Sequence, residues 1–308
     1  MSNKRGAGAG VALALVIIII LIAVIYLASS GQLNSLLPQN HGSSPNAFST
    51  TASISGPVLY GHSGSIGLTY FNPFPEQITS TVDLTAGSSS YLSVGTSTAT
   101  VQMPASMPSP ASAGFNVTCE QANQQSSTTF AVYVENYTQN VTTDVVTYPY
   151  GINSATIQTL LPQQNPVPGF LTITATPLEI ETGLSSGPAQ SSMSISFAPA
   201  YYNGNVYTGS QTSSPNGQIS SLTITIKDAS GGVSSASVFY GSQGSLPLVR
   251  SGNDLTLTIN NVNQAAVSGG LPLEITAANQ SVSTQNLIMI SATYNYQYYL
   301  SGPIVSCQ

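Results

Sequence analysis

Hydrophobic residues follow two different patterns along the chain, one before residue 30 and one after residue 47. Residues 11–27 form an unbroken apolar run with four consecutive isoleucines at its centre, and no other stretch of the chain resembles it. At about 1.5 Å per helical residue, residues 11–28 cover about 27 Å, close to the thickness of the hydrocarbon core of a bilayer. A backbone in lipid must satisfy its own hydrogen bonds, so the run predicts a transmembrane helix over residues 7–28.

The charges beside this run predict its orientation. Lys4 and Arg5 precede it and are half of the basic residues in the protein. The positive-inside rule keeps such residues in the cytoplasm. We therefore expect residues 1–6 inside the cell and everything after residue 28 outside it.

Three fates are open to this N-terminal segment. It can stay as a signal anchor, or it can be a secretory signal cut after Ser30, although its apolar run is longer than that of a usual signal peptide. The third fate rests on a resemblance: Lys4-Arg5-Gly6 followed by the apolar run resembles the class III signal peptides of archaeal type IV pilin-like surface proteins. The resemblance covers about the first 28 of the 308 residues. It implies a cut between Gly6 and Ala7, after which the apolar helix stays on the mature protein and packs into a filament core.

From residue 47 the apolar positions form short alternations of period two, which predict β-strands. Each run is rich in β-branched or aromatic residues and is bounded by Gly, Pro or Ser clusters. The expected strands are at residues 66–70, 77–84, 91–103, 115–119, 130–134, 141–148, 152–160, 171–175, 193–197, 222–226, 255–259, 271–275 and 287–300. The predicted fold class is all-β: an N-terminal transmembrane helix followed by two antiparallel β-sandwich domains of immunoglobulin-like or jelly-roll type.

Composition divides the outer part into segments. Residues 29–46 are mostly Gly, Ser, Pro, Asn and Gln, which is typical of a flexible tether. Residues 161–169 contain three prolines and cannot form an inner strand, so they are the expected linker between domains. The first sandwich is then expected at residues 47–160 and the second at residues 170–308.

The chain carries very little charge. Charged residues make up 5% of it, and after residue 30 the only bases are Lys227 and Arg250 against ten acids, a net charge of −8. A fold with few carboxylates and few ion pairs loses little when carboxylates are protonated, so we expect tolerance of low external pH. The composition resembles that of surface proteins of acid-living archaea. So few bases exclude a nucleic-acid-binding surface.

The chain contains two cysteines, Cys119 and Cys307. Outside the cell an even, low count predicts one disulfide, and two free thiols are the alternative. The bond would return the C-terminus to the first predicted sandwich. One pair of cysteines is too few for a structural metal site.

Few residues suggest catalysis, so we expect no enzyme activity, no cofactor and no metal. His62 lies in a Gly-His-Ser-Gly-Ser string that fails the nucleophile-elbow spacing and is expected to be a turn. His41 lies in the tether, and Glu179 and Glu181 share one strand face, where a solvated face is a simpler interpretation than a cation site.

Four sequons offer glycosylation sites at Asn116, Asn136, Asn140 and Asn279, a number that chance explains in so Ser- and Thr-rich a chain. Asn136 and Asn140 are expected to flank a hairpin turn, which makes them the favoured pair.

The last strand is rich in tyrosine. Tyr294, Tyr296, Tyr298 and Tyr299 could form a subunit interface or a surface on which sugars stack, because tyrosine combines apolar area with a polar group. The alternative is a strand buried on both faces.

These features together predict a non-enzymatic, membrane-anchored extracellular protein with a structural or adhesive role. The expected assembly is a pilin-like filament or its tip; the alternatives are a spike, turret or membrane-embedded capsid protein of an archaeal virus, and a surface receptor for sugars or peptides. Its expected partners are the lipid bilayer, further copies of itself or other surface or virion subunits, and glycan, with no nucleic acid.

Overall fold

The structure, a computed structural model, describes residues 49–72, 74, 76–87, 90–104, 111–152, 157, 169–183, 188–199, 204–208 and 217–308. The predicted segments 1–6, 7–28 and 29–46 lie outside these residues, as does all of the predicted linker 161–169 except Gly169. Within the described part of the chain, no helix is both long enough and apolar enough to cross a membrane. Residues Phe48–Gln308 form one unit, and the description below is of that unit alone.

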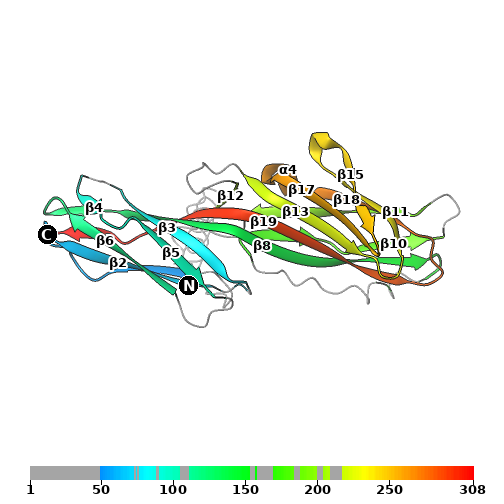
Figure 1. Ribbon diagram of the computed structural model, residues 1–308, viewed down its shortest axis with the longest axis horizontal. Helices are drawn as coiled ribbons and strands as arrows, with labels where there is room; N and C mark the ends of the chain where they lie inside the picture. The colour runs from blue at the N-terminus through cyan, green and yellow to red at the C-terminus, as the bar shows by residue number, and fades with distance from the viewer. Residues whose placement is uncertain are drawn as a thin grey trace, which may run out of the picture. The chain divides into compact units, whose positions relative to one another are not determined.

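The described chain is mostly β-strand, in antiparallel sheets consistent with a sandwich, as its period-two pattern predicts (Figure 1). A four-stranded sheet has the order β1 (Ser49–Ile54), β2 (Ser63–Phe71), β6 (Ala111–Cys119) and β4 (Leu92–Val94). A five-stranded sheet has the order β15 (Ser245–Pro247), β14 (Val233–Phe239), β18 (Leu271–Ala277), β11 (Gln190–Pro199) and β9 (Leu171–Ala175).

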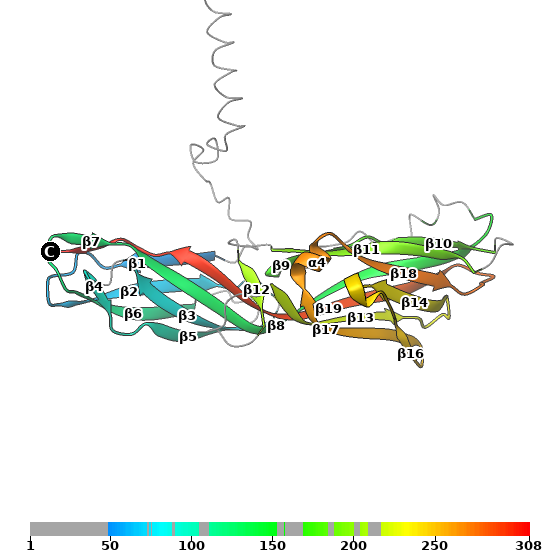
Figure 2. The ribbon, with the colours of Figure 1, turned by 90° about the horizontal axis from the view of Figure 1, so that it is seen from above.

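A nine-stranded sheet underlies both of these. Its main path runs β16 (Val249–Ser251), β17 (Asp254–Asn263), β13 (Gln218–Lys227), β19 (Thr284–Ser301), β8 (Thr128–Pro149), β3 (Ile78–Ala86) and β5 (Thr98–Met103). Off this path, β10 (Leu178–Thr182) pairs in parallel with β8, and β12 (Asn205–Tyr207) pairs with β19. In Figure 2, β11 and β18 of the five-stranded sheet lie on one side, and β13 and β17 of the nine-stranded sheet lie on the other.

Four short elements complete the described fold. β7 (Gln124–Ser126) and β20 (Val305–Cys307) make a two-stranded sheet. The helix α4 (Gln264–Ser268) is capped by Asn263, whose side-chain oxygen accepts from the backbone N–H groups of Ala265 and Ala266. A single 3-10 turn, η1 (Gly241–Gln243), joins β14 to β15.

The long pair β8–β19 connects the two ends of this unit. Its register runs from Thr284 opposite Thr147 to Ser301 opposite Thr129, and 22 residues of extended chain in β8 measure about 70 Å. Strands from both predicted sandwiches therefore share one sheet. The predicted division at residues 161–169 stays a prediction.

Alternation along the strands builds the core. Leu222, Ile224 and Ile226 of β13 are fully buried, whereas Thr223 and Thr225 between them are partly exposed. The sheets meet through such residues: the rings of Phe115 in β6 and Phe130 in β8 have centroids 5.5 Å apart.

Three strand predictions need correction. The segments 130–134 and 141–148 belong to one strand, β8, and the segment 91–103 is two strands, β4 and β5. The segment 152–160 falls mostly outside the described residues, and the two that are described, Ile152 and Ile157, are not in a strand. In the first case a bulge, described below, mimics the polar interruption of a turn.

Candidate functional site

A β-bulge in the middle of β8 is the main irregularity of the long pair. Tyr137 lies opposite Tyr294 and Val134 opposite Tyr296, so Glu135 and Asn136 together face the single residue Asn295. Asn136 has φ 53°, a left-handed conformation that asparagine tolerates better than most residues. Its N–H donates to Oδ1 of Asn295 at 2.8 Å. The bulge leaves the side chains of Glu135 and Asn136 exposed.

A pocket of about 210 Å³ opens beside this bulge, where β3 leaves β8. Pairing between β3 and β8 ends at Ser80 opposite Val134, and the residues that precede it on β3 form the other wall. The pocket, called the bulge pocket below, is lined by Glu76, Gln77, Ile78, Thr79, Val134, Glu135, Asn136, Tyr137 and Thr138. The hydroxyl of Tyr137 donates to Oε2 of Glu76 at 3.4 Å. Its chemistry is two carboxylates, amides and hydroxyls, which suits a ligand rich in hydroxyl groups.

The outer surface of the same sheet carries a second group of polar and aromatic side chains. The strand register places Asp83, Ala131 and Tyr299 in one row across β3, β8 and β19. The next row holds Thr81, Tyr133 and Gln297, and the one beyond it holds Glu135 and Asn295, with Tyr207 of β12 opposite Asn295. We call six of these residues the tyrosine face: Asp83, Tyr133, Glu135, Tyr207, Gln297 and Tyr299.

Hydrogen bonds hold this face together around Gln297. Its side chain is 4% exposed, and Nε2 donates to the hydroxyl of Tyr299 at 2.7 Å. Burial raises the pKa of Tyr133, nearby Asp83 and Tyr299 raise it further, and a hydrogen bond with Gln297 opposes them. Tyr133 and Tyr299 thus lie on either side of one buried amide, which fixes both phenol groups.

Tyr207 lies at the edge of the tyrosine face with its ring edge-on to Tyr133, at a centroid distance of 6.4 Å. The side chain is 1% exposed, and its hydroxyl has no hydrogen-bond partner among the described residues. Burial raises its pKa well above the usual value, and the charges of Glu135 and Tyr133 add to the effect. The hydroxyl is therefore held neutral beside a carboxylate.

The opposite face of β19 is an aromatic core, which corrects part of the predicted tyrosine interface. Tyr294, Tyr296 and Tyr298 are fully buried, whereas Tyr299 is 54% exposed. The ring of Phe170 stacks on Tyr296 at 5.0 Å and on Tyr298 at 6.2 Å, and the Tyr294 hydroxyl donates to Oε1 of Gln139 at 2.7 Å. Three of the four tyrosines are thus unavailable to a partner, because the two strand faces have different surroundings.

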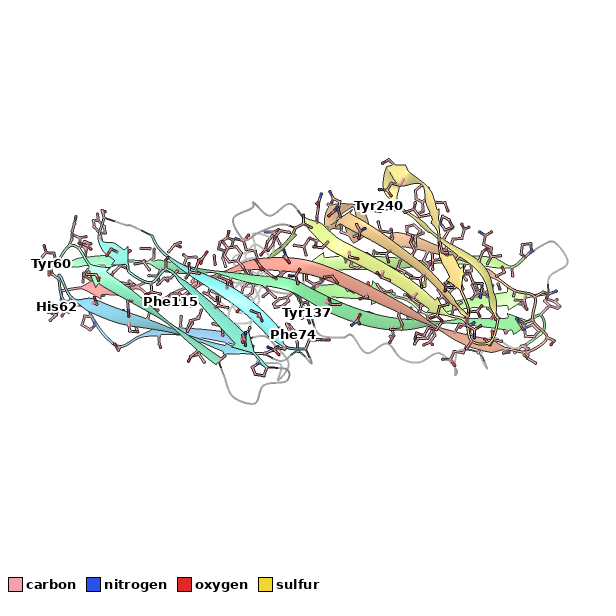
Figure 3. The ribbon with its side chains drawn as sticks, viewed as in Figure 1. Tyr60, His62, Phe74, Phe115, Tyr137 and Tyr240 are labelled. Carbon is pink, nitrogen blue, oxygen red and sulfur yellow. A yellow bond between two sulfur atoms is a disulfide. The ribbon has the colours of Figure 1, made fainter. Side chains whose placement is uncertain are left out.

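Phe74 and Tyr137 complete the aromatic core (Figure 3), defined as Phe74, Tyr137, Phe170, Tyr294, Tyr296 and Tyr298. Their rings are 5.8 Å apart, and each lies edge-on to Phe170. Tyr137 therefore contributes to both sides of the bulge: its ring packs in this core while its hydroxyl reaches the bulge pocket.

The disulfide prediction is confirmed: Cys119 at the end of β6 is bonded to Cys307 in β20. Both cysteines are buried, and Val58 donates to the carbonyl of Ser306 at 2.9 Å beside them. The terminal residue Gln308 accepts from the N–H of Tyr60 at 2.6 Å. The C-terminus is therefore fixed by a covalent bond and by strand pairing.

The four sequon asparagines are all exposed. Asn116 lies in β6, Asn140 in β8 and Asn279 in the connection from β18 to β19. The predicted hairpin turn between Asn136 and Asn140 is wrong, because β8 continues through both and Asn136 occupies the bulge. Glycosylation of these residues stays a prediction.

The other candidate residues form no reactive group. His62 is exposed and follows a turn closed by its N–H on the carbonyl of Leu59, and Tyr60 lies at the same end (Figure 3). Glu179 and Glu181 are partly exposed on β10, opposite Val146 and Tyr148. Across the described ranges, no three His, Cys, Asp or Glu side chains come together in a way that could hold a metal ion. Gly6, Ala7 and His41 lie outside the described residues.

No family model matches the chain, and no curated protein does. Among solved structures, it is similar to part of an alpha-2-macroglobulin from Escherichia coli, from domain MG7 to the C-terminus, at a TM-score of 0.25 and 11% identity over 61% of this chain and 24% of that one. It is also similar to a red sea bream transglutaminase at a TM-score of 0.20 and 8% identity, over 85% of this chain and 31% of that one. The chain thus spans only about a quarter to a third of these two proteins.

Proposed function

We propose that the protein is a non-enzymatic, membrane-anchored subunit of an extracellular surface assembly, with a structural or adhesive role. One observation carries this proposal: an apolar run of bilayer length, preceded by Lys4 and Arg5, comes before a β-rich body closed by a disulfide. Structural disulfides persist in oxidising compartments, which supports an extracellular position for the body. The pilin-like N-terminus favours a filament subunit or its tip.

The body suits such a role. The C-terminus is fixed by Cys307, and the long pair β8–β19 joins strands from both ends of the unit. We propose that the body divides into two sandwiches of immunoglobulin-like or jelly-roll type around this pair. A stiff body of this kind would hold its own contact surfaces in fixed positions relative to one another.

The small number of ion pairs supports the proposal that the protein stays folded at low external pH. In the described ranges one salt bridge is present, between Arg250 and the buried Asp228 at 3.0 Å. Strand faces are covered instead by paired hydroxyls, such as Thr223 with Thr258 at 3.0 Å. Such contacts keep their geometry when carboxylates become protonated, which is the physical basis for tolerance of low external pH.

The test is the N-terminal sequence and intact mass of the protein recovered from both the membrane and the soluble fractions of cells that carry the processing peptidase. A mature start at Ala7 supports the filament subunit. A start at Met1 or Ser2 supports an uncut anchor and favours the alternative of a virion protein embedded in a membrane. A start at Gly31, with the protein in the soluble fraction, would overturn the anchored role.

A second measurement tests the topology. Protease added to intact cells should digest the body, or leave it cell-associated only as a resistant disulfide-closed core, while the N-terminal basic segment stays protected. Complete protection of the body until the membrane is opened would place it in the cytosol and contradict the proposal.

A further inference from the structure

We propose that the tyrosine face binds a neutral oligosaccharide. This inference rests on the proposed function, because an adhesive protein outside the cell meets glycans of cell surfaces and of neighbouring copies. It assigns a ligand class to the side of the sheet opposite the aromatic core.

The rings offer the apolar part of a sugar site. Tyr299 is 54% exposed, and Tyr133 is partly exposed and lies diagonally from it across the β8–β19 pair. Diagonal neighbours in an antiparallel pair are about 7–8 Å apart, within the span of adjacent sugar units. The C–H face of a sugar ring packs on an aromatic ring while the rim keeps its hydroxyls free. Two rings on neighbouring strands therefore suit a chain of sugars better than a single unit.

The polar groups beside the rings are already fixed. Gln297 is 4% exposed and hydrogen-bonded to the Tyr299 hydroxyl, so it cannot swing away when a ligand arrives. Asp83 accepts from the hydroxyl of Thr98 at 2.7 Å, which holds its carboxylate beside the rings. Carboxylates and amides that are fixed in advance accept hydrogen bonds from sugar hydroxyls at little entropic cost.

The hydroxyl of Tyr207 is an independent indication of a ligand. It is 1% exposed and has no hydrogen-bond partner among the described residues, although its neighbours Glu135 and Tyr133 are polar. Buried polar groups are nearly always paired in proteins. Because the oxygen itself is buried, a water held between it and a bound sugar would satisfy it at the edge of the face.

Charge decides which sugars fit. The tyrosine face contains Asp83 and Glu135 and no basic residue, and the bases of the body are Lys227 in β13 and Arg250 in β16, of which Arg250 is paired with Asp228. Sulfated or uronic-acid polymers would meet two carboxylates without a compensating cation. The expected ligand is therefore uncharged.

The experiment measures binding of linear neutral oligosaccharides to the full chain. The protein is produced with its disulfide oxidised in a bacterial host that adds no N-glycans, so that a sugar on Asn136 cannot occupy the face. It is held in lipid nanodiscs, because glycoside detergents would compete. Hexasaccharides of glucose, mannose and N-acetylglucosamine are titrated by calorimetry, with heparin and polygalacturonate as charged probes.

We expect at least one neutral hexasaccharide to bind with a dissociation constant below about 1 mM, and the charged polymers not to bind. Tyr299→Ala should weaken binding about tenfold, as loss of an exposed anchor ring does, while Tyr299→Phe retains most of the affinity. Tyr150→Ala is the matched control, because Tyr150 is 67% exposed beyond the end of β8 and lies outside the face.

Equal losses in Tyr150→Ala and Tyr299→Ala, binding of charged polymers alone, or no binding of any neutral probe would overturn the proposal. A thermal melt of each variant, with and without reductant, checks that the fold is unchanged. These results do not depend on where the N-terminus begins, so a failure here leaves the anchored role standing, and the reverse is also true.

Discussion

The two faces of the C-terminal half of β19 carry the same residue type and have opposite roles. On one face, Tyr294, Tyr296 and Tyr298 are fully buried, and the ring of Phe170 stacks on the last two. On the other, Tyr299 is largely exposed and is fixed by Gln297. Successive residues of a strand point to opposite faces, so a change of one position moves a tyrosine from core to surface. The layers packed on each face therefore decide what a tyrosine does, and its identity alone does not.

The largest expected loss of stability comes from removing a tyrosine of the buried face. Tyr296→Ala removes a ring that stacks on Phe170 and lies against Gly204, where an added Cβ would meet that ring at 2.4 Å. A cavity of this size should cost about 3–5 kcal/mol of unfolding free energy, measured by urea denaturation. Tyr299→Ala on the exposed face should cost about 1–2 kcal/mol, because it leaves Nε2 of the buried Gln297 without that acceptor. Equal costs for the two variants would show that the two faces are not distinct.

Removal of the disulfide should cause the next largest loss of stability. It also compares the two ends of the tyrosine-rich part of β19. Cys119→Ala with Cys307→Ala opens a loop with a sequence separation of 188 residues, which should cost about 2–4 kcal/mol. We expect the loss to be uneven. Hydrogen exchange should rise most in β20 and at the end of β19 near Tyr299, and least around Tyr294, because Tyr294 is fixed in the aromatic core.

Uniform loss of protection along β19 would instead mean that the unit opens as a whole. Reduction of the wild-type bond with a thiol is the control, since it removes the same constraint without altering the side chains. Both treatments should give the same exchange pattern.

The sequence predicted the all-β class and the disulfide because both depend on local signals. Alternation of Leu222, Ile224 and Ile226 with threonines is sufficient to identify a strand and its buried face. An even pair of cysteines in a segment expected outside the cell is sufficient to predict one bond. These inferences need no knowledge of what packs against the strand.

The candidate site could be predicted only in part, because it depends on register. The polar pair Glu135 and Asn136 looks like a turn in the sequence, and only the opposing strand shows that two residues there face one. Gln297 gives a partial signal, since polar residues alternating with tyrosines indicate a two-sided strand. Its approach to Tyr133 and Tyr207 needs the pairing of β8, β19 and β12, which no local pattern contains.

The smallest effect is expected from titration of the buried tyrosines, because it is absent at neutral pH. Burial raises the pKa of Tyr294 on the core face, and burial, Glu135 and Tyr133 raise that of Tyr207 at the outer face. The folded protein then holds these protons more tightly than the unfolded chain. Stability from this source is complete below about pH 10, where unfolded tyrosine ionises, and is lost as the pH rises further.

Urea midpoints measured from about pH 7 to about pH 11.5 should therefore be flat at first and then fall. Each of Tyr294→Phe and Tyr207→Phe should make the alkaline decline shallower, because each removes one proton that the folded state retains. Tyr294→Phe should also lower stability at neutral pH, since it leaves Oε1 of Gln139 without that donor, whereas Tyr207→Phe removes a hydroxyl that has no described partner and should not.

A decline equally steep in both variants and the wild type would assign alkaline unfolding to other groups. A neutral-pH loss in Tyr207→Phe would mean that its hydroxyl has a partner in solution, and that would weaken the contrast between the two faces.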